Sequence, residues 1–71
     1  MRKHHMFDYL DEHDRDQTAI MYLWNGWLLY AEYYNGKEWA DIDPSQLTDD
    51  DIAKGWREGV VGWKYEIKQA L

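Results

Sequence analysis

The sequence predicts an α+β fold in which a three-stranded antiparallel meander is packed by a long C-terminal helix. Three features lead to this prediction: two Asn-Gly dipeptides, the aromatic segments that flank them, and an apolar stripe at helical spacing in the C-terminal third. The chain has 71 residues, which is room for one domain, so residues 1–71 are expected to form a single small domain.

The two Asn-Gly dipeptides organise the middle of the chain. Asn25-Gly26 and Asn35-Gly36 suit the type I′ turn, because Asn and Gly tolerate the positive φ that both central positions of this hairpin turn require. Their flanks are rich in the aromatic and branched residues that favour strands. The sequence therefore predicts strands at about residues 18–24, 27–34 and 37–42.

Two-residue turns would also fix the register of this meander. One face would then carry Ile20, Tyr22, Trp24, Trp27, Leu29, Ala31, Tyr33, Ala40 and Ile42. A trough at Ala31 and Ala40 would receive the helix. The opposite face would carry Met21, Leu23, Leu28, Tyr30, Glu32, Tyr34, Lys37, Trp39 and Asp41, which is too apolar for a solvated surface. We expect an interface there, with candidate apolar contacts at Leu28, Tyr30, Tyr34 and Trp39.

The C-terminal third is predicted to be helical from about residue 49 to residue 70. Pro44 after Asp43 indicates a short turn, and Thr48 is placed as the N-cap, with Asp51 three residues later. The apolar stripe consists of Ile52, Trp56, Val60, Trp63, Ile67 and Leu71. The glycines at positions 55, 59 and 62 each cost about 1 kcal/mol in a helix interior. These glycines leave open a bend or a break of the helix at Gly59–Gly62, and a break there followed by a terminal strand is the alternative.

The N-terminal segment fits two interpretations. Met6, Phe7 and Leu10 would share one face of a short helix at residues 4–12, which is the preferred prediction. His5, Phe7 and Tyr9 alternate as in a strand, so a fourth strand is the alternative.

The charge is strongly acidic and unevenly distributed. The net charge is −6, and 12 of the 14 acidic residues lie between Asp8 and Asp51 with only Arg15 and Lys37 against them. Phosphates would be repelled, so direct nucleic-acid binding is not expected. The candidate acidic contacts are Asp11, Glu12, Asp14, Asp16, Glu32, Glu38, Asp41, Asp43, Asp49, Asp50 and Asp51. The meander would place the 11–16 and 41–51 clusters at opposite ends of the sheet, roughly 20–25 Å apart. Solubility and helix capping are the alternative role for these carboxylates.

Sequence features of catalysis, metal binding and membrane insertion are missing. The chain has no cysteine, one serine, and an adjacent His4-His5 pair whose side chains diverge in either a helix or a strand. We therefore expect no enzyme activity, no metal and no cofactor. The sequence contains no run of about 18 apolar residues, so no membrane span is expected. Met1-Arg2-Lys3 is not followed by the apolar stretch of a secretory signal. A cytoplasmic location is expected, in the bacterial host if a phage encodes the chain.

These features predict a small acidic protein-binding inhibitor, of the type that viruses and mobile elements encode. Its expected partner is a host protein with a basic nucleic-acid-binding surface, such as a nuclease, polymerase, repair or defence enzyme. Carboxylates spread over a rigid surface would mimic duplex DNA, which carries one charge per about 1.7 Å. The alternative is a homo-oligomeric structural or adaptor module, for example a homodimer, that uses the apolar sheet face without any mimicry.

Overall fold

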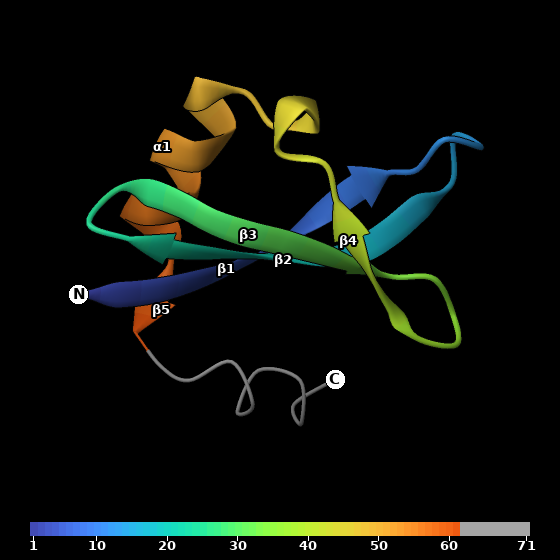
Figure 1. Cartoon of the computed structure of the whole chain (residues 1–71), viewed down its shortest axis with the longest axis horizontal. Coiled ribbons are helices and arrows are strands. Elements are labelled where there is room, and N and C mark those ends of the chain that lie inside the picture. Colours follow the sequence, from blue (N-terminus) through green and yellow to red (C-terminus); the bar gives the residue numbers. More distant parts are fainter. Residues whose placement is uncertain (62–71) are drawn as a thin grey trace.

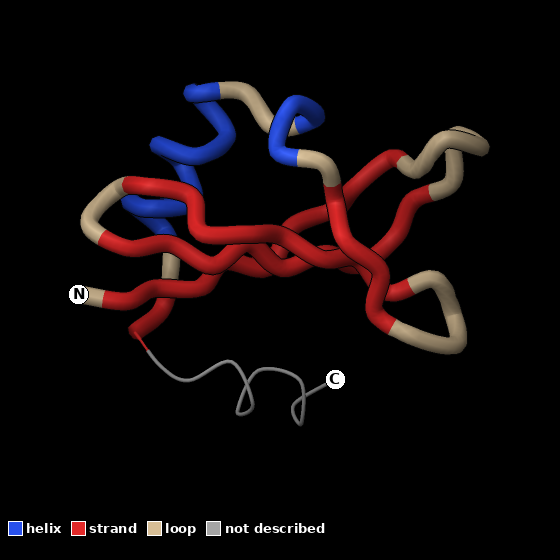
Figure 2. The backbone as a smooth tube through the Cα atoms, in the orientation of Figure 1, coloured by secondary structure: helices blue, strands red, loops and turns tan. Residues whose placement is uncertain are grey.

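The computed structural model describes residues 1–61 and shows one antiparallel sheet with two helices on the same side of it (Figure 1). The strands are β1 (Arg2–Leu10), β2 (Asp16–Trp24), β3 (Trp27–Tyr34), β4 (Trp39–Ile42) and β5 (Val60–Val61), in the spatial order β4-β3-β2-β1-β5. A 3₁₀ helix, η1 (Pro44–Gln46), and helix α1 (Asp49–Glu58) lie between β4 and β5 in the chain. Strand predominates over helix (Figure 2), so the prediction of a three-stranded meander packed by a long helix is wrong.

The turn between β2 and β3 has the predicted conformation. Asn25 and Gly26 have φ values of 49° and 86°, the left-handed geometry of a type I′ turn. The predicted strands at 18–24, 27–34 and 37–42 coincide with β2, β3 and β4 to within two residues at each end.

The pairing of β2 with β3 contains a β-bulge that the sequence did not predict. Next to the turn Leu23 lies opposite Leu28, but the following pair is Tyr22 with Tyr30, so Leu29 is an extra residue in β3. A bulge shifts every later pair by one residue, and a shift of one residue exchanges the two faces of a strand relative to its neighbour.

The sheet therefore has a core face, which carries the helices, and an outer face opposite to it. The core face carries Lys3, His5, Phe7, Tyr9, Ala19, Met21, Leu23, Leu28, Ala31, Tyr33, Ala40 and Ile42. The outer face carries His4, Met6, Asp8, Leu10, Thr18, Ile20, Tyr22, Trp24, Trp27, Tyr30, Glu32, Tyr34, Trp39 and Asp41. The prediction placed Ile20, Tyr22 and Trp24 beneath the helix, and the bulge explains why they lie on the other side.

The turn between β3 and β4 is longer than a two-residue turn. The side-chain oxygen of Asn35 accepts hydrogen bonds from the backbone amides of Lys37 and Glu38, both at 3.0 Å. This Asx-type turn uses four residues. Consequently β4 pairs two residues later than predicted, and Ala31 lies opposite Ile42.

The N-terminal segment is a strand, so the preferred prediction of a short helix is wrong. β1 pairs with β2 from Arg2 to Leu10, with Phe7 opposite Ala19. The alternation of His5, Phe7 and Tyr9 was the correct signal. Tertiary structure decides the outcome. Residues 19–24 of β2 are all apolar, and this strand is protected from exposure as a sheet edge only when another strand pairs on each side of it.

The start of α1 follows the prediction. The backbone amide of Asp51 donates to Oγ1 of Thr48 at 3.1 Å, and the amide of Thr48 donates to the Asp51 carboxylate at 3.0 Å. This reciprocal capping box satisfies two of the amides that a helix N-terminus leaves without partners.

The end of α1 contradicts the prediction of a helix over 49–70. The helix stops at Glu58, and after Gly59 the chain forms β5, in which Val60 pairs with His4 at the edge of the sheet. The alternative of a break near Gly59–Gly62 is therefore correct within the described residues, where the two-residue strand β5 follows it. The rest of the alternative terminal strand lies outside the described residues. Val60 is exposed and does not continue the helical stripe. The rest of that stripe lies outside the described residues: Trp63, Ile67 and Leu71.

Close packing of α1 on β2 forms the core. A Cβ atom at Gly55 would overlap the sulfur of Met21 and lie 3.4 Å from a methyl group of Leu23, so only glycine allows this approach. The buried cluster is Ala19, Met21, Leu23, Ala31 and Ile42, and the residues packed against it are Phe7, Tyr9, Leu28, Tyr33, Leu47, Ile52 and Trp56.

A lysine from β1 holds the C-terminal end of α1. The ammonium of Lys3 donates to the backbone carbonyl of Trp56 at 2.9 Å and lies 4.4 Å from the centroid of the Trp56 ring. A cation near the helix C-terminus and over an aromatic face is favourable on both counts. This contact ties α1 to β1 one turn before the chain enters β5.

Replacement of Gly59 tests how tightly α1 is joined to the sheet. A Cβ there would lie 2.5 Å from the carbonyl oxygen of Gly55 and 3.2 Å from that of His4. We expect Gly59→Ala to lower the free energy of unfolding by more than about 1 kcal/mol, measured by urea denaturation. The neighbouring exposed substitution Glu58→Ala serves as the control and should change it by less than about 0.5 kcal/mol. Equal stability of the two variants would contradict this packing.

Candidate functional site

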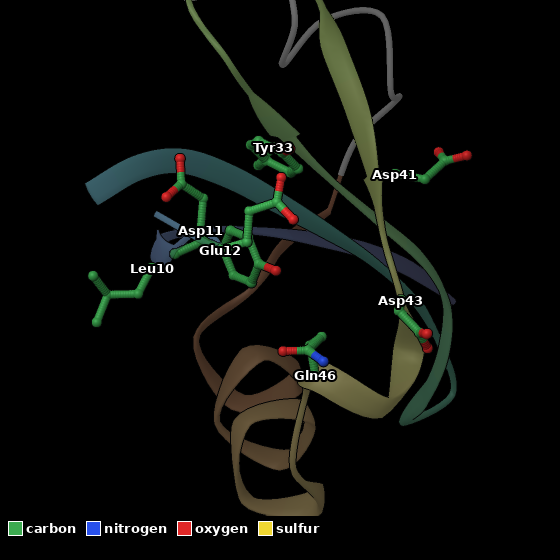
Figure 3. Close-up of a pocket in the computed structure, with 8 residues that line it drawn as sticks. Leu10, Asp11, Glu12, Tyr33, Asp41, Asp43 and Gln46 are labelled. Atoms are coloured by element: carbon green, nitrogen blue, oxygen red, sulfur yellow. The ribbon is translucent and has the colours of Figure 1, made fainter. Parts of the chain in front are cut away.

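The two acidic clusters of the sequence meet at one hollow of the surface (Figure 3). The hollow has a volume of about 320 Å³ and lies between the loop that joins β1 to β2 and the segment formed by β4 and η1. We call it the acidic hollow, and its lining residues are Tyr9, Leu10, Asp11, Glu12, Tyr33, Asp41, Asp43 and Gln46. The prediction that the clusters lie at opposite ends of the sheet is therefore wrong for these members.

The short length of β4 brings the clusters together. β4 leaves the sheet at Ile42, which lies opposite Ala31 near the middle of β3. η1 follows at once, and Asp43 caps it by accepting a hydrogen bond from the amide of Ser45 at 3.0 Å. This path places Asp43 and Gln46 across the hollow from the β1–β2 loop, as Figure 3 shows.

Two tyrosines give the hollow an aromatic wall. The rings of Tyr9 and Tyr33 have centroids 5.3 Å apart and are tilted by 38°. They come from β1 and β3, on either side of β2, and Tyr33 lies opposite Ala19. The small Ala19 side chain leaves room for the two rings to approach over β2. The hollow thus presents aromatic surface beside carboxylates.

Asp11 has a structural role in this region. Its carboxylate accepts hydrogen bonds from the amides of His13 and Arg15 at 2.8 and 3.0 Å, from Nε2 of Gln17 at 3.0 Å, and from Nε of Arg15 at 3.2 Å. Its side chain is almost fully buried. The hydrogen bond from Gln17 and then that from the Arg15 backbone hold the pKa of this carboxyl well below its usual range. Asp11 therefore orders the loop and leaves little surface for a partner.

Two further carboxylates from the predicted set cap helices. The pKa of Asp43 is lowered chiefly by the backbone amide of Ser45, and that of Asp51 chiefly by the backbone amide of Thr48. Both side chains remain exposed, so capping leaves their outer oxygen surface open to solvent. Of the remaining predicted acidic residues, Glu32 is buried. The others are exposed: Glu12, Asp14, Asp16, Glu38, Asp41, Asp49 and Asp50.

The predicted apolar contacts are divided between the two faces of the sheet. Leu28 packs against the buried core on the core face, so the structure gives it a packing role. Tyr30, Tyr34 and Trp39 lie on the outer face as predicted, and the rings of Tyr34 and Trp39 have centroids 5.5 Å apart.

The sequence did not identify several residues of these surfaces. Trp24 and Trp27 belong to the outer face with exposed fractions of 44% and 76%, because the bulge reverses their expected direction. Tyr9 and Gln46 line the acidic hollow, and only the strand-like alternation of the N-terminal segment signalled the position of Tyr9.

Residues 1–61 contain no group of three or more histidine, aspartate or glutamate side chains that could hold a metal ion. Within the same residues, no helix is long and apolar enough to cross a membrane. No family model matches the sequence, and neither a curated protein nor a solved structure matches it.

Replacement of Asp11 by asparagine tests its structural role and gives a defined pH dependence. The folded-state pKa lies below the unfolded value of about 3.9, so the stabilising effect is complete above pH about 5 and is lost as the pH falls below about 4. We expect Asp11→Asn to unfold at lower urea concentration than the wild type at pH 7, with the gap narrowing as the solution is acidified below pH about 4.

The control for this measurement is Glu12→Gln, an exposed neighbour on the same loop. It should leave the urea midpoint nearly unchanged at pH 7. A gap between wild type and Asp11→Asn that stayed constant down to pH about 2 would rule out the lowered pKa of Asp11 as its cause.

Proposed function

We propose that this chain is a small acidic protein-binding inhibitor that engages a nucleic-acid-handling protein through the surface around the acidic hollow. The observation that carries the proposal is that carboxylates from two distant parts of the sequence line one concave surface together with two tyrosines. Carboxylates would attract a basic surface and speed association, and tyrosines are among the side chains that anchor protein interfaces.

The charge of the described residues supports this proposal. Residues 1–61 contain 13 acidic and six basic residues, a net charge of −7. Lys3 is half-buried against α1, which further reduces the basic charge on the surface. A partner groove that normally holds nucleic acid has the complementary sign. Mimicry of nucleic-acid charge is the proposed mechanism, and inhibition follows because the chain and the nucleic acid compete for one groove.

Mimicry of nucleic-acid charge also leads to a proposed target, source and location for the chain. A nuclease, polymerase, repair or defence enzyme of a bacterial host is the proposed target, a virus or mobile element the proposed source, and the host cytoplasm the proposed location. The chain itself is proposed to act by binding alone, without catalysis.

Charge reversal at the hollow tests this function. Proteins from bacterial lysate are captured on the immobilised chain at low salt and purified. Each captured protein is then loaded with a fluorescent DNA duplex, and we measure whether the chain displaces this DNA. We expect Glu12→Lys/Asp41→Lys to slow association with such a target by about tenfold at low salt, and added salt to narrow the difference.

The matched control is Asp50→Lys/Glu58→Lys, which changes the net charge by the same amount on α1. It should slow association much less than the hollow variant. Equal effects of the two variants would show that only net charge matters, and unchanged association of the hollow variant would overturn the proposal.

A second candidate function is a homo-oligomeric adaptor, and exposed aromatic residues on the outer face favour it. Trp24 and Trp27 lie opposite each other at the β2–β3 turn and are open to solvent. Aromatic side chains with this exposure are common anchors of protein interfaces.

Sedimentation velocity distinguishes this second candidate. If the chain forms dimers through the outer face, Trp24→Glu/Trp27→Glu should be monomeric, whereas the exposed helix substitution Ala53→Glu should leave the dimer intact. A wild-type chain that sediments as a monomer at about 100 μM would rule this candidate out.

A further inference from the structure

One side of β1 is only partly paired. In the spatial order β4-β3-β2-β1-β5, β1 has β2 on one side, and β5 on the other side pairs with Lys3 and His4 alone. Figure 1 shows β5 beside the N-terminal end of β1. Within residues 1–61, no strand therefore pairs with this side of β1 along residues 6–10. We call this side of residues 6–10 the β1 edge.

The register of β1 with β2 shows which backbone groups point out from the β1 edge. The amide of Asp11 donates to the carbonyl of Arg15 at 3.0 Å, and this pair continues the β1–β2 register. In an antiparallel ladder, alternate residues direct both backbone groups to the same neighbour. The odd-numbered residues of β1 therefore bond to β2. The even-numbered residues direct the amide and the carbonyl outward, and on the β1 edge these are Met6, Asp8 and Leu10.

The β1 edge has none of the usual protection of an edge strand. Edge strands are commonly blocked by proline, lysine or a bulge. Residues 6–10 contain neither proline nor lysine, and their pairing with β2 is regular. Met6 and Leu10 have exposed fractions of 41% and 59%, and Asp8 is exposed as well. An open, extended edge of this kind is the geometry that binds a peptide by addition of a strand.

The charge along the β1 edge indicates which occupant fits. Asp8 lies at the middle of residues 6–10, and Asp16 lies diagonally across from it on the same face. Neither carboxylate forms an ion pair with a residue of the described part of the chain. A second copy is disfavoured, because the register that pairs all of residues 6–10 places two copies of Asp8 opposite each other. Lysine or arginine opposite Asp8 gives a favourable cross-strand pair instead.

We propose that the β1 edge binds an extended segment of a partner protein that pairs antiparallel to β1. The segment carries lysine or arginine opposite Asp8 and apolar residues two positions before and after it, opposite Leu10 and Met6. Backbone hydrogen bonds supply the affinity and the alternate side chains supply the specificity. The proposal goes beyond the inhibition proposed above and does not rest on it, because the segment bonds to the backbone of β1.

A synthetic peptide tests the proposal by NMR titration of the isotope-labelled full-length chain. The peptide is Ser-Val-Thr-Lys-Thr-Val-Ser with both ends blocked, so its lysine can pair with Asp8. Up to about 5 mM peptide, we expect saturable shifts of the amide signals of Met6, Asp8 and Leu10. The same peptide with glutamate in place of lysine should bind at least about fivefold more weakly. The absence of saturable shifts at these amides, or equal affinity for both peptides, would overturn the proposal.

Two N-methylated peptides separate strand addition from simple charge attraction. The valines and the lysine of the bound peptide direct their amides towards β1, and the threonines direct theirs away. N-methylation of the valines and the lysine should weaken binding by about tenfold or more, because it removes the donors that face β1. N-methylation of the two threonines is the matched control and should change the affinity by less than about twofold. Equal affinities of the two methylated peptides would rule out strand addition.

Reversal of the charge at Asp8 tests the specificity. We expect Asp8→Lys to bind the glutamate peptide at least about fivefold more tightly than the lysine peptide. The matched control Asp50→Lys makes the same charge change at an exposed position of α1 and should keep the wild-type preference. An Asp8→Lys chain that is folded by circular dichroism and still prefers the lysine peptide would contradict the proposed pairing.

Hydrogen exchange without peptide distinguishes an open β1 edge from one that a second copy occupies. We expect the amides of Met6, Asp8 and Leu10 to exchange faster than those of Phe7 and Tyr9, which face β2. The difference should be the same at about 20 μM and at about 500 μM protein. Protection of the three outward amides that grows with concentration, together with a dimer in sedimentation velocity, would show that a second copy holds the edge and would overturn the proposal.

Discussion

The arrangement of this domain depends on one extra residue in β3. The bulge at Leu29 decides which side of β2 faces α1, and so it decides which residues form the core. With the bulge, Met21 lies beneath Gly55, where the absence of a side chain lets the helix backbone approach the sheet.

The sequence predicted features whose causes are local. Asn25-Gly26 fixed the first turn, and Thr48 with Asp51 fixed the start of α1, because each depends on groups within four residues of one another. The bulge was not predictable in this way, since β2 offers apolar residues to both faces and either register buries a plausible set. The longer second turn depends on the side chain of Asn35, which accepts two amide hydrogen bonds in place of a tight turn.

The two ends of the described part of the chain were mispredicted because tertiary contacts outweigh helix periodicity there. Residues 2–10 pair with β2, and the 60–61 pair joins β1 where Gly59 permits close contact with its backbone. The acidic hollow shows the same limit. Its charge was evident from composition, but the meeting of Glu12 with Asp43 depends on where β4 leaves the sheet, and that follows from the register.

The carboxylates of this chain serve two kinds of purpose, and the structure separates them. Asp11 is enclosed by donors of its own loop, and the caps at Asp43 and Asp51 hold the helices. Glu12 and Asp41 have no such structural bond among the hydrogen bonds described for residues 1–61, and both border the acidic hollow. Side chains that stabilise the fold are poor subjects for charge reversal, because a loss of binding would then be inseparable from a loss of structure. The exposed pair at the hollow, Glu12 and Asp41, is free of that ambiguity. Charge reversal at Glu12 and Asp41 therefore tests binding at the hollow without removing one of the caps or loop contacts that hold the fold together.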